Sequence, residues 1–145
     1  MNQEDLNAFC NSLWATTHVV QWRGSHVWKV GKKVFAIGRW SNREHTGITF
    51  KVSEIAFEVL RNEPGLRPAP YFASRGMKWI QRYAEPGLSD EDLKSYLSQS
   101  HHIVFSGLTK KLQKELMEVF KVKMTSAQIA KAQALASEMW EKINN

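Results

Sequence analysis

The sequence has almost no cysteine and no long apolar run. Cys10 is the only cysteine among 145 residues, so an intrachain disulfide is excluded and a reducing compartment is favoured. The longest uncharged run, residues 6–22, is interrupted by Asn, Ser, Thr, His and Gln, which argues against a membrane span. Glu4 and Asp5 stand where a secretory signal would be basic. We therefore expect a cytoplasmic protein that does not associate with membranes.

The sequence also lacks the motifs of catalysis and metal binding. It has no Gly-x-Ser-x-Gly elbow, and residues 30–33 (VGKK) lack the glycine spacing and following helix of a phosphate-binding loop. The two adjacent Ser-His pairs, at 25–26 and 100–101, do not place a nucleophile against its base. The five histidines show no metal-ligand spacing. We therefore predict a protein that is not an enzyme and that binds no metal or cofactor.

What the sequence does have is an ordinary globular composition with an uneven distribution of charge. Hydrophobic residues make up 43% and charged residues 23% of the chain, which is typical of a folded domain. The formal net charge is +6, and residues 20–82 hold 12 of the 20 basic residues but only four of the 14 acidic ones. A positive field concentrated in one segment favours a polyanionic partner. The alternative is a basic surface that serves solubility alone.

Helical periodicity predicts helices at both ends of the chain and a short one between them. Asn2 and Ser53 are the expected N-caps of the first two helices. Their apolar stripes are Leu6, Phe9, Cys10 and Leu13 in the first and Ile55, Ala56, Val59 and Leu60 in the second. Ser89 caps a long helix that ends at Gly107, another helix follows it, and a final helix begins at 125–126.

Alternation of apolar and polar residues predicts strands at 26–30, 33–37 and 47–52. The first two are joined by a tight turn at 31–32, and a polar loop at 38–46 precedes the third. The residues between the first helix and the first of these strands are expected to form a connector.

A proline-containing linker at 62–70 leads to a second predicted hairpin, with strands at 71–73 and 77–83. We expect one α+β domain over residues 1–120 and a helical extension over 121–145. The extension has an apolar seam at Ile129, Ala132, Ala136, Met139 and Ile143. This seam is expected to pack on the same domain, with a weak dimer contact as the alternative.

The order and spacing of several short segments resemble those of the MmcQ/YjbR family of small bacterial proteins. The segments are 27–36 (VWKVGKKVFA), 48–53 (ITFKVS), 68–71 (PAPY), 77–80 (MKWI), and Ser100 followed by Leu108 and Lys110-Lys111. The resemblance implies a fold related to the frataxin-like CyaY arrangement, a twisted antiparallel sheet with helices on one face, to which this chain adds a C-terminal helix. The family is described as a predicted DNA-binding group with a double-wing motif.

The candidate nucleic-acid-binding residues are the cations of the predicted strands and hairpins together with one tryptophan in a basic loop. They are Lys29, Lys32, Lys33, Arg39, Trp40, Arg43, Lys51, Arg75, Lys78 and Arg82. Lysine and arginine neutralise phosphates and release counterions, and Trp40 can stack on an unpaired base or wedge into a groove. In the other interpretation, the hairpin lysines protect strand edges from aggregation. Trp28 and Trp79 are expected to lie in the core of the sheet.

We therefore expect non-enzymatic DNA binding through a basic sheet and hairpin surface. The alternative is a small protein-interaction domain whose surface includes Trp79, Tyr83 and the terminal helix. In that alternative the positive charge is incidental.

Overall fold

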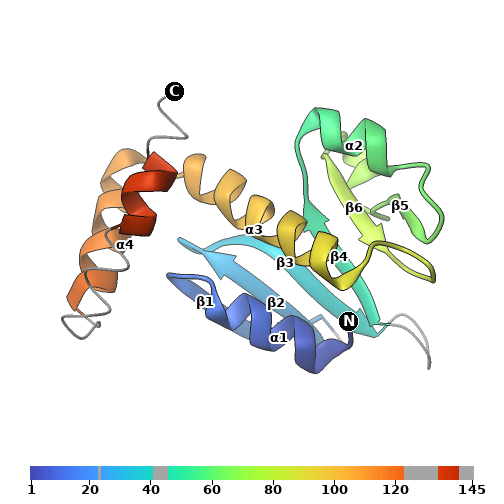
Figure 1. The fold of residues 1–145 in the computed structure, drawn as a ribbon, viewed down its shortest axis with the longest axis horizontal. Coiled ribbons are helices and arrows are strands. Elements are labelled where there is room, and N and C mark those ends of the chain that lie inside the picture. Colours follow the sequence, from blue (N-terminus) through green and yellow to red (C-terminus); the bar gives the residue numbers. More distant parts are fainter. Residues whose placement is uncertain (23, 41–45, 123–133, 141–145) are drawn as a thin grey trace.

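A six-stranded antiparallel sheet with the strand order β1-β2-β3-β4-β6-β5 forms the centre of the computed structural model, which describes residues 1–22, 24–40, 46–122 and 134–140 (Figure 1). The strands are Thr16–Gln21 (β1), Ser25–Val30 (β2), Lys33–Trp40 (β3), Thr46–Lys51 (β4), Leu66–Pro68 (β5) and Trp79–Arg82 (β6). β2, β3 and β4 confirm the three predicted strands, and β3 continues further than the alternation indicated.

Helices α1 (Gln3–Ser12) and α3 (Asp90–Ser106) lie across one face of this sheet, as Figure 1 shows. α1 begins with a capping box, in which the side chain of Asn2 accepts the Asp5 N–H and the Asp5 carboxylate accepts the Asn2 N–H. The side chain of Ser89 caps α3 by accepting the Asp92 N–H. The expected α+β fold, with helices on one face of an antiparallel sheet, is confirmed.

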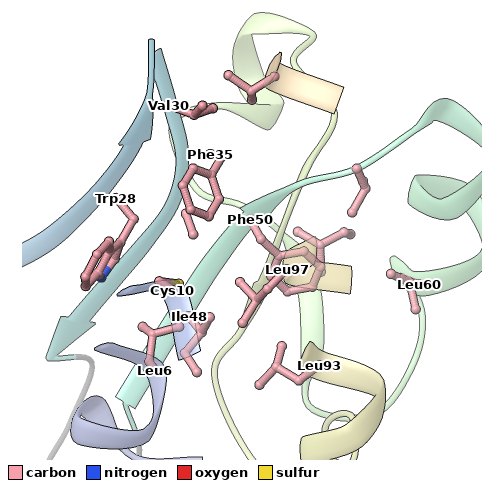
Figure 2. Close-up of a cluster of buried hydrophobic side chains, with 14 of the residues drawn as sticks. Leu6, Cys10, Trp28, Val30, Phe35, Ile48, Phe50, Leu60, Leu93 and Leu97 are labelled. Carbon is pink, nitrogen blue, oxygen red and sulfur yellow. The ribbon is translucent and has the colours of Figure 1, made fainter. Parts of the chain in front are cut away.

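The hydrophobic core fills the space between this face and the helices (Figure 2). Phe35 and Phe50 from the strands, Leu6 and Cys10 from α1, and Leu93 and Leu97 from α3 are all inaccessible to solvent. Complete burial of a side chain of this size stabilises the fold by about 1.5–3 kcal/mol. The two helices are therefore held in place mainly by their buried apolar side chains, which in α1 belong to the predicted stripe.

The short helix α2 (Glu54–Leu60) has its predicted N-cap but only part of its predicted buried face. The Ser53 side chain accepts the Ala56 N–H, while the buried residues are Phe57 and Leu60. Leu60 is buried and Ala56 packs against the core as expected, but Ile55 is 79% and Val59 59% exposed, so half of the expected stripe is wrong. A helix of seven residues spans only about two turns, which is too short for apolar periodicity to determine which side is buried.

Two further expectations about the sheet are wrong. The predicted connector contains β1, an edge strand whose side chains are mostly exposed and therefore do not alternate. The second predicted hairpin does not form, because Ala73–Arg75 is a 3-10 turn and β6 pairs with β4 and β5. β5 lies within the predicted linker, where an edge strand can accommodate Pro68.

The C-terminal part contributes helix α4 (Lys110–Val122) and a helix at 134–140. α4 packs partly through Phe120, whose ring lies 5.5 Å from that of Trp14. Most of the predicted terminal helix, including the start of its seam, lies outside the described residues, so its packing and the weak dimer contact stay predictions. Among the described helices, none has the length and apolar character that a membrane crossing requires.

Candidate binding face of the sheet

The sheet has a second face, which we call the open face, opposite the core. One row of paired residues crosses it from β1 to β5: Val19, Val27, Ile37, Thr49, Gln81 and Arg67. None of these residues belongs to the core cluster. Helices α1 to α4 all direct side chains into the core cluster, which leaves the open face without one of these helices upon it.

The row changes from apolar to polar along its length. Its β4, β6 and β5 members form a hydrogen-bonded chain, in which the Gln81 amide donates to the Thr49 hydroxyl at 3.2 Å. Arg67 Nε and Nη2 both donate to Gln81 Oε1, at 2.9 and 2.7 Å. The guanidinium of Arg67 also lies 4.6 Å from the centroid of the Tyr83 ring. An exposed arginine is thus held in a fixed orientation by neutral groups, which leaves its charge available to an anion.

The strands bear only positive charge. They contain six basic residues and no acidic one, and the basic residues are Lys29, Lys33, Arg39, Lys51, Arg67 and Arg82. Lys29 and Lys51 belong to the open face because each lies two residues from a member of the row. The acidic residues of the described chain lie on helices and connecting segments. The open face therefore has a positive potential that no strand carboxylate offsets.

The segment between β5 and β6 folds over one end of the open face. The Phe72 ring stacks on Trp79 with 4.8 Å between centroids and 17° between planes. Beside it, Tyr71 is 76% exposed and has a positive φ of 80°, and the Arg75 guanidinium lies 5.6 Å from its ring centroid. Trp79 is buried as predicted, although beneath Phe72 and outside the core cluster, and its Nε1 has no hydrogen-bond partner among the described residues. This segment thus carries one exposed ring with a guanidinium beside it, next to an aromatic stack that holds the segment on the sheet.

The turn between β2 and β3 is not free to act as a wing. Gly31 and Lys32 both have positive φ, as a two-residue hairpin turn requires. Lys32 and Lys33 are exposed there, in agreement with their predicted place. A Cβ atom on Gly31 would lie 2.4 Å from a methyl carbon of Leu108, so the turn packs closely against the corner between α3 and α4. The two lysines therefore lie at one end of the sheet, on an anchored turn.

Two of the predicted binding residues lie on the core side instead. Arg82 is only 6% exposed, donates to the Met1 carbonyl at 3.1 Å and pairs with Glu85 at 3.2 Å. The Lys78 ammonium lies 4.7 Å from the ring centroid of Phe57 on α2. Both side chains alternate in step with Ile80, and Ile80 lies on the face that the helices cover. Arg82 and Lys78 therefore do not belong to the candidate surface.

Three predicted residues cannot be placed as side chains. Arg39 and Trp40 end β3 opposite Gly47 and Thr46, and their side chains lie outside the described part of the structure. Arg43 lies outside the described residues altogether. The residues that the structure brings together on the open face are thus Lys29, Lys51 and the unpredicted Arg67, with Arg75 at the edge.

Arg67, Tyr71 and Tyr83 complete this surface, and the sequence did not identify them as nucleic-acid-binding residues, although Tyr83 was part of the surface expected for the protein-interaction alternative. Arg67 had been assigned to the proline-containing linker because a three-residue strand with a proline produces no alternation. Only the spacing of Arg67, Tyr71 and Arg75 by four residues hinted at a shared surface.

Ser100 and His101, the second of the two adjacent Ser-His pairs, are buried and hydrogen-bonded in the core. Ser100 donates to the Lys51 carbonyl at 2.5 Å and lies within reach of the Tyr96 carbonyl at 2.9 Å. His101 Nε2 donates to the Trp14 carbonyl at 2.8 Å, and burial lowers its pKa to about 4. Burial raises the pKa of the Cys10 thiol to about 12, so this cysteine is a protonated core residue. Within the described residues, no three His, Cys, Asp or Glu side chains gather as metal ligands.

Comparison with known proteins identifies the family of this fold. The chain is similar to the solved structure of the Deinococcus radiodurans protein DR2400, with domain DUF419, at a TM-score of 0.69 and 22% identity. This match covers 79% of the present chain and 87% of the Deinococcus chain. A Pseudomonas syringae protein has a TM-score of 0.57 at 19% identity, covering 72% and 99% respectively. A comparison with curated proteins gives no significant match. The family model YjbR matches residues 11–103, and the chain therefore belongs to the YjbR family.

Proposed function

We propose that this protein binds nucleic acid through the open face of its sheet. The observation that carries the proposal is the distribution of charge: basic residues stand on the open face, and none of the described strands carries an acidic residue. Lys29, Lys51 and Arg67 share the open face, and Arg67 is oriented by hydrogen bonds to a neutral amide. A surface of this kind attracts a polyanion at long range and binds phosphates at short range.

The affinity of such a surface is largely independent of sequence and sensitive to salt. Each cation that neutralises a phosphate releases condensed counterions, so the logarithm of the binding constant falls linearly with the logarithm of salt concentration. Three cations on phosphates contribute a slope of about −2 to −3.

The decisive experiment compares two charge-reversed variants of the whole chain. One carries Lys29→Glu, Lys51→Glu and Arg67→Glu on the open face, and the control carries Lys94→Glu and Lys111→Glu with Lys114→Glu on α3 and α4. Both lower the formal charge from +6 to zero, so they differ only in where the charge is lost. DNA binding is measured by fluorescence anisotropy at two salt concentrations, with circular dichroism to verify folding.

We expect the open-face variant to lose most of the affinity and of the salt slope, while the control keeps most of both. Equal losses in the two variants would show that net charge alone attracts DNA, and would overturn the proposed site. Absence of DNA binding by the unaltered chain at low salt would overturn the function itself.

A second candidate function is protein interaction, and the edge of the sheet favours it. β1 is an edge strand, and three large apolar residues on it and just after it are exposed: Val19 at 38%, Val20 at 52% and Trp22 at 56%. An edge strand with apolar side chains can pair with an extended segment of a partner. Under this alternative, binding of the partner protein to the unaltered chain would be insensitive to salt, and the charge reversals would not change it.

A further inference from the structure

We propose that the nucleic acid bound by the open face is single-stranded, an inference that rests on the proposed function. It is carried by two ring–guanidinium pairs on β5, on the segment that joins it to β6, and just after β6, which we together call the aromatic–arginine patch: Arg67, Tyr71, Arg75 and Tyr83. Each ring in the patch has a guanidinium against it, at 4.6 Å for the Arg67–Tyr83 pair and 5.6 Å for the Arg75–Tyr71 pair.

Tyr71 is exposed in a way that the packing of the fold does not require. Its side chain is 76% exposed, the largest exposed fraction among the tyrosines, phenylalanines and tryptophans of the described chain. Its φ of 80° is unfavourable for a residue with a Cβ atom. The next residue, Phe72, stacks on Trp79 and fixes the segment to the sheet. An aromatic ring is thus presented to solvent from an anchored segment.

Tyr83 and Arg67 form a second position with the same chemistry. Arg67 donates twice to Gln81, so its planar group is held beside the Tyr83 ring. Aromatic rings and guanidinium planes are the surfaces on which unpaired bases stack, and the arginines also contact the phosphates between them. Lys51, paired opposite Trp79 in the next strand, adds a cation beside this end of the face.

Duplex DNA does not fit the same surface as well. Its bases are already stacked on one another, and reading them requires an element that enters a groove. The β2–β3 turn cannot extend freely into a groove, because it packs against Leu108 and Leu112. The segment over residues 71–78 contains a 3-10 turn in place of the second predicted wing. What remains is a sheet face with aromatic side chains, the arrangement that sheet-based single-strand binders use.

The test uses Tyr71→Asn and Tyr71→Phe as a matched pair in the whole chain. Asparagine accepts positive φ more readily than other residues with a side chain, so Tyr71→Asn removes the ring without adding backbone strain. The probes are an oligothymidylate of about 12 nucleotides, a length that a sheet-based site covers, and a duplex of the same length at the same salt concentration.

We expect the unaltered chain to bind the single strand at least about tenfold more tightly than the duplex. Tyr71→Asn should weaken single-strand binding by about 5- to 100-fold, the range that corresponds to the loss of one stacked base. Tyr71→Phe, which keeps the ring, should bind the single strand about as tightly as the unaltered chain. Neither variant should change duplex binding appreciably.

The two proposals fail in different ways. Equal affinity for both probes, or single-strand affinity that Tyr71→Asn leaves unchanged, would overturn the single-strand inference while leaving a nucleic-acid-binding face in place. Binding of neither probe at low salt would overturn the proposed function and this inference together.

Discussion

The buried histidine His101 makes the stability of this protein depend on pH in a way that one substitution can test. Its ring lies 5.2 Å from that of Phe35 and 5.8 Å from that of Trp14, and its Nε2 donates to the Trp14 carbonyl. Desolvation lowers its pKa from 6.5 to about 4, the hydrogen bond to Trp14 opposes this shift, and neighbouring His102 adds to it. The folded protein therefore holds His101 neutral at pH values where the unfolded chain protonates it.

The sign and size of the effect follow from this difference. Between pH 6.5 and pH 4 the unfolded state binds the extra proton, so the free energy of unfolding falls as the pH falls through this interval. Stability from the neutral ring is complete above pH 6.5. At pH 5 the loss attributable to His101 is about 2 kcal/mol, worked from the two pKa values at about 1.4 kcal/mol per pKa unit. The pKa of His18 is also lowered, so its contribution has the same sign.

Urea unfolding followed by tryptophan fluorescence at pH 7 and pH 5 measures this loss. His101→Gln removes the titrating group and keeps an amide N–H for the Trp14 carbonyl, so the variant is less stable at pH 7 but loses about 2 kcal/mol less than the unaltered chain on acidification. The control His102→Gln, next to it on α3, should retain most of the pH dependence. If His101→Gln and the unaltered chain lose the same stability between the two pH values, the assigned cause is wrong.

Three other substitutions or modifications test the packing. Gly31→Ala should destabilise the fold by about 2–4 kcal/mol in urea unfolding, because it adds backbone strain at positive φ and a contact with Leu108; Leu108→Ala in the same chain should recover part of this loss, and no recovery would contradict the steric reason. Arg82→Met should lower the free energy of unfolding by about 1.5–3 kcal/mol, because a buried charged donor is lost. The control Arg75→Met, on the surface, should change it by about 0.5 kcal/mol or less. Equal effects of the two substitutions would refute the assignment of Arg82 to the core side. Cys10 should resist iodoacetamide in the folded protein and react in urea, since its thiol is buried with a pKa of about 12; rapid labelling without denaturant would contradict its place in the core.

Local chemistry in the sequence predicted the elements that have strong local signals. The caps at Asn2, Ser53 and Ser89 located the starts of three helices, because a side chain that accepts an orphan N–H acts within one turn. Strands β2, β3 and β4 were also predicted, because alternation of apolar and polar residues is a local pattern. β1 and β5 were missed, since an exposed edge strand and a three-residue strand containing proline produce no alternation.

The candidate surface was harder to predict because it depends on which face of the sheet the helices cover. Period-two alternation puts Ile80 and Arg82 on one side of β6 and Trp79 on the other, but it does not say which side the helices cover, and Arg82 lies on the core side. Lys29 and Lys51 were identified, whereas Arg67 acquires its role only through pairing with β6. Pairing between segments distant in sequence is decided by tertiary packing, and short-range patterns contain no record of it.

The anchored turn at Gly31 also limits how this protein can be shortened for experiments. The family match ends at residue 103, yet Leu108 and Leu112 beyond it cover the turn, and Leu6 and Cys10 before its start fill the core. A fragment cut at the borders of the match would leave apolar side chains of the sheet in contact with water at both ends, and it would tend to aggregate. Expression of residues 1–122 or longer preserves both sets of contacts.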